Sequence, residues 1–202
     1  ASLGQQLLIL ELAQRLNKKV SKIDSSQLGV FIGMGTDSEV CRYGLRARLE
    51  AVLKDKYSEG FYDSIAPKLE SQHVLGTMPN VVANRISSSL NGQAMGFSVS
   101  QEDGSGLVSL ELAYHGIRAG KMSSAIVGAV DLCENDLDKK AIAELIGARN
   151  CRDGAAAVLL KSRSQALRDG DEILSVIKLA NFSKTDKAET LGDSYSPAAQ
   201  GL

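Results

Sequence analysis

The sequence contains little of what a metal centre, a disulfide framework or a nucleic-acid surface would require. Three cysteines occur in 202 residues, none of them in a CxxC pair, and there are only two histidines. An odd number of cysteines without metal-ligand spacing predicts buried, reduced thiols. Positive charge is not in excess, because 23 lysines and arginines stand against 24 aspartates and glutamates. We therefore expect no metal site and no binding to nucleic acid.

Long apolar runs are also absent. No stretch approaches the roughly 20 apolar residues that cross a bilayer, and the N-terminus lacks the basic and then apolar pattern of a secretion signal. We expect a cytoplasmic protein without a membrane span. Hydrophobic residues still make up 44% of the chain, which suffices for the core of a globular domain.

Strand and helix patterns alternate along the chain. Apolar runs and period-two alternation predict strands over residues 28–34, 97–99, 125–132, 151–161 and 173–182. Apolar residues at three- and four-residue spacing predict helices over residues 2–17, 37–53, 78–90, 107–119, 137–147 and 164–169. This alternation indicates a layered α/β fold.

The helix over residues 37–53 should pack its apolar side against the rest of the protein, with Asp37 or Ser38 as its N-cap. The side chains that we expect to point inward are Val40, Leu45, Leu49 and Val52. Those that we expect to point mostly outward are Arg42, Arg46 and Arg48. Residues 54–76, which include His73, are weakly patterned and should form a loop with short helical turns over the core.

The most informative segment is the polar turn between the strand at 97–99 and the helix that follows it. The turn reads Gln101-Glu102-Asp103-Gly104-Ser105-Gly106. Its glycines permit a sharp bend, and its acidic residues fall where the free amides of a helix favour negative charge. Many enzymes place a nucleophile on such a bend, because the amides lower the pKa of a thiol and stabilise an oxyanion. Here we interpret Asp103 as a helix cap worth about 0.5–2 kcal/mol.

Three segments resemble β-ketoacyl synthases, which have the thiolase-like fold. They are the helix with the Ala83, Arg85, Ile86, Ser87 and Leu90 pattern, the turn with its helix, and the strand at 151–161. Laying the family's elbow helix on Leu107-Val108-Ser109-Leu110 puts its acyl-accepting cysteine at Asp103. The acidic turn most resembles the cysteine-lacking ketosynthase-like domains of polyunsaturated fatty acid synthases, either the chain-length factor or the domain beside the acyltransferase.

The resemblance implies a thiolase-like α-β-α-β-α architecture, of which this chain would hold the N-terminal half or a truncated version. Residues 1–202 would form a single ketosynthase-like domain, a fragment or an internally truncated one, with poor agreement over 183–202. The HGTGT-like and GHT-like motifs that supply the family's two catalytic histidines are not present in the sequence.

The resemblance further implies a non-catalytic role in scaffolding, dimerisation or chain-length control within a multidomain synthase. No residue is assigned as catalytic: Asp103 holds the nucleophile position, with Glu102 and Ser105 on the same turn. The implied partners are a second copy or a ketosynthase domain, an acyl carrier protein and other synthase domains. No cofactor is implied beyond the phosphopantetheine of a carrier protein, which the arginines at 42, 46 and 48 could contact.

Three other functions stay open. The chain could be an active synthase fragment whose nucleophile lies elsewhere, or a malonyl decarboxylase, although acidic residues at the elbow would repel both the malonyl carboxylate and the enolate. A hydrolase that uses Ser105 gains slight support from Gly104-Ser105-Gly106. That run lacks G-x-S-x-G spacing and an obvious acid and histidine pair.

Overall fold

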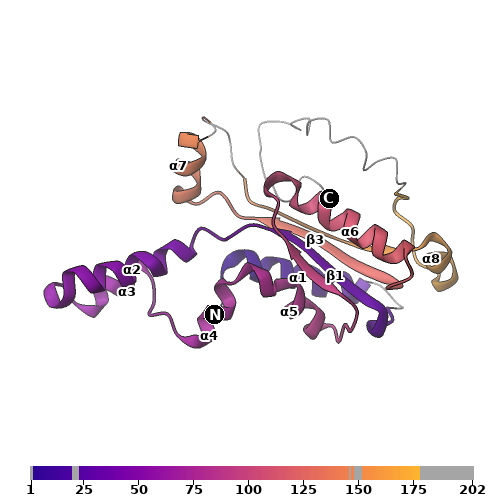
Figure 1. Ribbon diagram of the computed structural model, residues 1–202, viewed down its shortest axis with the longest axis horizontal. Helices are drawn as coiled ribbons and strands as arrows, with labels where there is room; N and C mark the ends of the chain where they lie inside the picture. The colour runs from indigo at the N-terminus through magenta and orange to yellow at the C-terminus, as the bar shows by residue number, and fades with distance from the viewer. Residues whose placement is uncertain (1, 20–22, 146, 148–151, 178–202) are drawn as a thin grey trace.

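The computed structural model describes residues 2–19, 23–145, 147 and 152–177 (Figure 1). Its strands are β1 (Leu28–Met34), β2 (Gly96–Val99), β3 (Ser124–Asp131) and β4 (Gly154–Lys161). Its α-helices are α1 (Gly4–Lys19), α2 (Val40–Leu53), α3 (Glu59–Ile65), α4 (Ser71–Thr77), α5 (Val82–Ser89), α6 (Ser105–Arg118), α7 (Asp136–Leu145) and α8 (Arg163–Asp169). Short 3-10 turns are η1 (Ser25–Gln27), η2 (Lys54–Lys56), η3 (Pro79–Val81) and η4 (Glu102–Gly104). Except for the strand at 173–182, the predicted elements are confirmed to within a few residues at their ends.

The four strands form one sheet in the order β2-β1-β3-β4. Strand β1 runs parallel to both β2 and β3, whereas β4 is antiparallel to β3. The carboxyl ends of β1, β2 and β3 therefore meet at one edge of the sheet, where β4 begins opposite Asp131. We call this the carboxyl edge, and in open α/β sheets it is where ligands bind.

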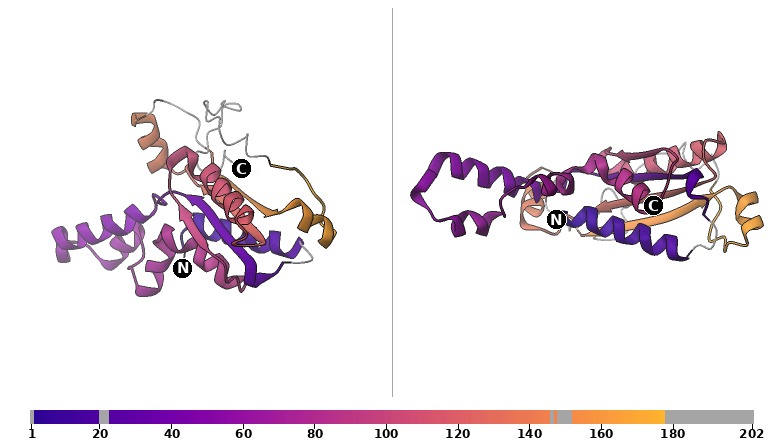
Figure 2. Two further views of the ribbon diagram at one scale, coloured as in Figure 1. Left: turned by 45° about the vertical axis from the view of Figure 1, so that its right-hand side comes forward. Right: turned by 90° about the horizontal axis from the view of Figure 1, so that it is seen from below.

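Helices cover both faces of the sheet (Figures 1 and 2). Every residue of β1 is buried, because alternate side chains of this central strand face opposite helical layers. On one face, α1 and α5 pack on β1 and β3 through residues such as Ile9, Ile32 and Ile86. On the other face, α6 packs through Ala113 against a cluster that includes Phe31 and Val127. The two layers confirm the expected α/β class.

Helices α2 and α3 do not lie over the core. They project from the carboxyl edge as a two-helix arm, residues 40–65 (Figures 1 and 2). The predicted orientation of α2 is confirmed for Arg42 and Arg48, which are exposed. It is wrong for Arg46, which is 3% exposed, and for Leu45 and Val52, which are 49% and 74% exposed. The reason is tertiary: Arg46 faces α3 and binds its carboxylates, which turns the apolar side chains to solvent.

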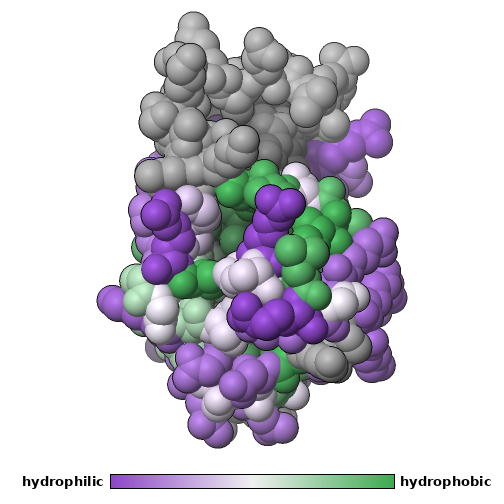
Figure 3. All heavy atoms as spheres, turned by 90° about the vertical axis from the view of Figure 1, so that its right-hand side faces the viewer, coloured by the Kyte–Doolittle hydropathy of each residue, from purple (hydrophilic) through white to green (hydrophobic). Residues whose placement is uncertain are grey.

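The predicted strand over residues 173–182 does not form in its described part, since residues 171–177 have no regular structure. Leu174 and Val176 are 89% and 53% exposed there. Figure 3 views the molecule from the side on which α8 lies and shows apolar surface among polar side chains. Residues 178–182 lie outside the described residues. Within the described ranges, every helix is too short or too polar to cross a lipid bilayer.

Candidate functional site at the carboxyl edge

The polar turn connects β2 directly to α6, as the sequence predicts. It contains the 3-10 turn η4, and α6 begins at Ser105, two residues earlier than expected. Glu102 has a φ of 45°, a left-handed conformation that costs an L-residue roughly 1–2 kcal/mol. The elbow therefore keeps a strained bend of the kind that presents a nucleophile, although no thiol lies on it.

The side chain of Ser105 closes this bend. Its Oγ accepts a hydrogen bond from the amide of Gln101 at 2.8 Å and donates one to the carbonyl of Glu102 at 2.7 Å. Ser105 is 1% exposed, so its hydroxyl holds the turn together and does not face solvent. This arrangement gives no support to a hydrolase that uses Ser105.

Asp103 does not occupy the N-cap position of α6. Gly104 is the N-cap residue of α6, and the helix has no side-chain hydrogen bond at that position. Asp103 nevertheless lies on the turn that precedes the helix, where the free amides attract negative charge. Stabilisation of the N-terminus of α6 by Asp103 stays a prediction.

The first turn of α6 sits directly on β1. A Cβ added to Gly33 would lie 2.6 Å from the carbonyl carbon of Ser105 and 2.7 Å from the amide nitrogen of Gly106. Small residues continue this contact along the buried side of the helix: Ser105, Gly106, Ser109, Ala113 and Gly116. Close packing of small residues on Gly33 thus sets the position of the elbow above the sheet.

Carboxylates from five segments converge at the carboxyl edge. Asp131 ends β3, and the acids whose charges act on it are Asp138, Asp153, Asp103 and Asp37. Burial, and then repulsion by these charges, raises the pKa of Asp131 to about 6. The surroundings of Asp103 are therefore negatively charged at neutral pH.

A cavity of about 190 Å³ opens at the same edge. Its lining residues are Gly4, Asp37, Glu39, Leu132, Asn135 and Asp153. Beside it, Ser38 donates a hydrogen bond to Asp138 at 2.7 Å and accepts one from Asn135 at 3.1 Å. Despite these acids, no group of histidines, cysteines and carboxylates suited to a metal ion occurs in the described part of the chain.

Neither histidine lies at the elbow. His73 is in α4, where it takes part in a capping box with Glu70, and His115 is in the last turn of α6, about 15 Å from its start. The cysteines do not supply a nucleophile to the elbow either. Cys41 is an exposed free thiol on α2, and Cys133 is 3% exposed and disulfide-bonded. The prediction of buried, reduced thiols is therefore wrong about the burial of Cys41 and about the redox state of Cys133, and Cys151 lies outside the described residues.

Sequence reasoning identified the elbow but missed the remaining acids of the site. Asp37 was interpreted only as a helix cap, and Asp131 and Asp153 were not singled out. Asp37 is 6% exposed and accepts hydrogen bonds from the amides of Glu39 and Gln5. The sequence did contain a signal for two of these acids, because Asp37 and Asp131 both lie at or just after the end of a predicted strand.

The elbow on a mixed α/β sheet is the arrangement of a ketosynthase-like domain, and the chain belongs to the β-ketoacyl synthase family. Residues 4–146 match the N-terminal domain of that family. A cluster 41 polyketide synthase of Aspergillus flavus is 30% identical over 193 residues, which cover 86% of this chain and 16% of that protein. The chain thus spans only a small part of this relative.

Solved structures support the same fold. The PfaC keto synthase-chain length factor superposes with a TM-score of 0.72 at 20% identity, over 82% of this chain and 21% of that one. AntDE:AntF, a type II acyl-carrier protein in complex with its ketosynthase, superposes with a TM-score of 0.60 at 16% identity, over 84% and 52% of the chains. The described residues therefore form part of a thiolase-like ketosynthase fold, as expected.

Proposed function

We propose that this chain is a non-catalytic ketosynthase-like element of a multidomain polyunsaturated fatty acid or polyketide-type synthase, acting in scaffolding, dimerisation or chain-length control. The observation that carries the proposal is the elbow. A strand, a strained bend and a helix N-terminus are all present, but the bend carries Glu102 and Asp103 and no thiol.

Electrostatics at the carboxyl edge support this proposal. Condensation requires a thiolate to accept an acyl group and positive or hydrogen-bonding groups to stabilise an enolate. Here the acids around Asp131 repel a thiolate, a malonyl carboxylate and an enolate alike. Neither histidine reaches the elbow to offset that repulsion. Losing the nucleophile of a catalytic unit typically costs several orders of magnitude in rate.

The free edge of the sheet supports a role in association. Within the described part of the chain, β2 pairs only with β1, so one side of its backbone is unpaired. Phe97 on this strand is 51% exposed, and its ring lies 5.9 Å from that of Phe31. An exposed aromatic beside an unpaired strand edge favours pairing with another chain. We propose a second copy or a catalytic ketosynthase domain as the partner on this edge.

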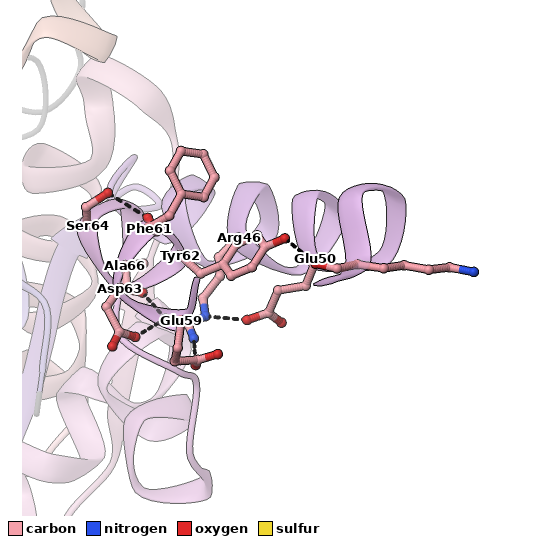
Figure 4. A network of polar contacts seen from close by, with 9 residues as sticks. Arg46, Glu50, Glu59, Phe61, Tyr62, Asp63, Ser64 and Ala66 are labelled. Carbon is pink, nitrogen blue, oxygen red and sulfur yellow. Dashed lines mark hydrogen bonds and ion pairs between the residues drawn. The ribbon is translucent and has the colours of Figure 1, made fainter. Parts of the chain in front are cut away.

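We also propose that the domain meets acyl groups on the phosphopantetheine of a carrier protein, as well as other synthase domains. The AntDE:AntF structure supports the carrier as a class of partner, because it contains an acyl-carrier protein with its ketosynthase. Fewer arginines of α2 are available to contact phosphopantetheine than the sequence predicted. Arg46 is buried among carboxylates (Figure 4), Arg42 is exposed but pairs with Glu39 at 3.0 Å, and Arg48 is exposed.

An acyl-transfer assay tests the proposal. The chain is incubated with labelled acyl and malonyl thioesters of a carrier protein, beside a cysteine-bearing ketosynthase domain as the positive control. We expect neither covalent label nor decarboxylation by the chain. Label that maps to a residue other than Cys41 would show an active fragment, and release of CO₂ without label would show a decarboxylase. Label on the exposed Cys41 that Cys41→Ser removes would be adventitious, and the proposal would stand.

A further inference from the structure

A second cavity, of about 320 Å³, lies at the edge of the sheet opposite the elbow. Strands β1 and β3 begin at this edge and β4 ends there, so Ser124 and Lys161 are paired across β3 and β4. Along β3, Ser124 lies about 23 Å from Asp131 at the carboxyl edge. We call this hollow the amino-edge cavity, and its volume is in the range of small-molecule sites. The lining residues on which the argument depends are Ile23, Asp24, Ser124, Lys161, Gln165 and Asp169.

Ser124 supplies a buried hydroxyl to the lining of this cavity. The residue is 2% exposed, and its Oγ has no hydrogen-bond partner in the described part of the chain. A buried polar group without a partner destabilises a folded protein. A ligand that hydrogen-bonds to this hydroxyl therefore relieves that destabilisation when it binds.

Carboxylates outnumber cations around the amino-edge cavity. The ammonium group of Lys161, whose side chain is 5% exposed, pairs with Asp169 at 3.0 Å and with Asp171 at 2.5 Å. Burial lowers the pKa of Lys161, but the hydrogen bonds to Asp171 and Asp169 outweigh that effect and leave the pKa raised. Asp24 adds a third carboxylate to the lining. The net charge at the cavity is therefore negative, which favours a cationic ligand over an anionic one.

Asp24 is the carboxylate that can accept a further hydrogen bond. Its Oδ1 accepts hydrogen bonds from the amide of Ser26 at 3.0 Å and from the hydroxyl of Ser26 at 2.6 Å. Its Oδ2 accepts none from the described residues, so it remains an acceptor for a ligand. On the other side of the lining, Asp169 is held by Lys161 and by Gln165, whose Nε2 donates to Oδ1 of Asp169 at 2.8 Å.

We propose that the amino-edge cavity binds the ammonium group of a small aliphatic amine. The ammonium donates charge-assisted hydrogen bonds to Oδ2 of Asp24 and to Oγ of Ser124. The apolar stem of the amine packs on Ile23. Malonyl groups and phosphopantetheine are anionic and are repelled here, so the site serves a ligand other than the acyl substrates of a synthase. This inference goes beyond the proposed function and does not depend on the elbow.

Titration of the isotope-labelled 202-residue chain with three small molecules, followed by amide chemical shifts, tests the proposal. Butylamine, 1-butanol and butyrate contain the same number of carbons and differ in charge near neutral pH. Butylamine should shift the amide resonances of Ser124 and Gln165 with saturation, and bind at least about tenfold more tightly than either of the others. Asp24→Asn and Ser124→Ala should each weaken the binding of butylamine by about tenfold.

Both variants should keep the fold, which circular dichroism checks. Asparagine can still cap the turn after residue 24, and alanine removes a hydroxyl that has no partner among the described residues. Glu172→Gln is the matched control, because Glu172 is an exposed acid next to Asp171 and does not line the cavity. It should change the affinity for butylamine by no more than about twofold.

Four results would overturn the proposal. They are equal affinities for butylamine and butyrate, no saturable shift with butylamine, shifts confined to the carboxyl edge, and wild-type affinity for butylamine in Asp24→Asn or Ser124→Ala. Shifts confined to the carboxyl edge would show that the amine follows the acids around Asp131 and not the amino-edge cavity.

Discussion

Gly33 is the residue through which the sheet positions the elbow, so Gly33→Ala should destabilise the protein strongly. The added Cβ would meet three backbone atoms of Ser105 and Gly106 at 2.6–2.7 Å, well inside van der Waals contact. Backbone cannot rotate away as a flexible side chain can. Helix α6 must therefore shift or tilt on β1, which disturbs the small-residue packing along its length.

We expect a loss of about 3 kcal/mol in the free energy of unfolding, the upper part of the range for overpacked cores. For a chain of this size such a loss lowers Tm by roughly 6–12 °C. Urea unfolding followed by circular dichroism measures the change, and an unaltered m-value would show that the unfolded state is the same.

Gly35→Ala is the control, because no atom lies within 4 Å of a Cβ at that position. It should change stability by no more than about 1 kcal/mol, and in the stabilising direction, since alanine restricts the unfolded chain more than glycine does. Equal effects of Gly33→Ala and Gly35→Ala would refute the reasoning. So would a Gly33→Ala chain within about 0.5 kcal/mol of the wild type.

Two further predictions concern the acids of the site. Glu102→Gly should be more stable than Glu102→Ala by about 1 kcal/mol. Both variants remove the charge, but only glycine adopts the left-handed φ of 45° without strain. Urea unfolding in which the alanine variant is as stable as the glycine variant, or more stable, would contradict the strain at this position. Asp131→Asn should stabilise the protein by about 1 kcal/mol at pH 8, after allowance for partial exposure. The pKa of Asp131 in the folded protein is raised to about 6, so the ionised carboxylate destabilises the folded protein above that pH. The stabilisation by Asp131→Asn should therefore be full above pH 6, decrease as the pH is lowered from 6, and vanish near pH 4. A pH-independent gain, or the same profile for the exposed Glu134→Gln control, would argue against it.

The local elements were predictable because their signals lie within short stretches of chain. The seven residues of β1 are apolar or glycine and all are buried. The elbow was equally readable, since the period of the apolar residues changes from two to three or four across a turn that contains glycine. The family resemblance rested on the same segments, and the match over residues 4–146 confirms it.

The orientation of α2 was not predictable from its own pattern. Its apolar residues at Leu45 and Val52 suggested an inward face, but Glu59 and Asp63 arrive from a second helix and bind Arg46. Because Arg46 is buried, separating it from its carboxylates would leave an unpaired buried charge, which strongly destabilises a folded protein. Periodicity describes one helix alone, so it cannot weigh that contact.

The sequence by itself determined the order of strands and helices, the acidic elbow and the absence of a thiol on it, because each depends on residues close together in the chain. Only the tertiary structure decided that acids from four other segments gather around Asp131 and that α2 turns apolar side chains outward. Both depend on distances between segments far apart in the sequence. Such distances, and the burial that goes with them, are set when the sheet and its helices pack.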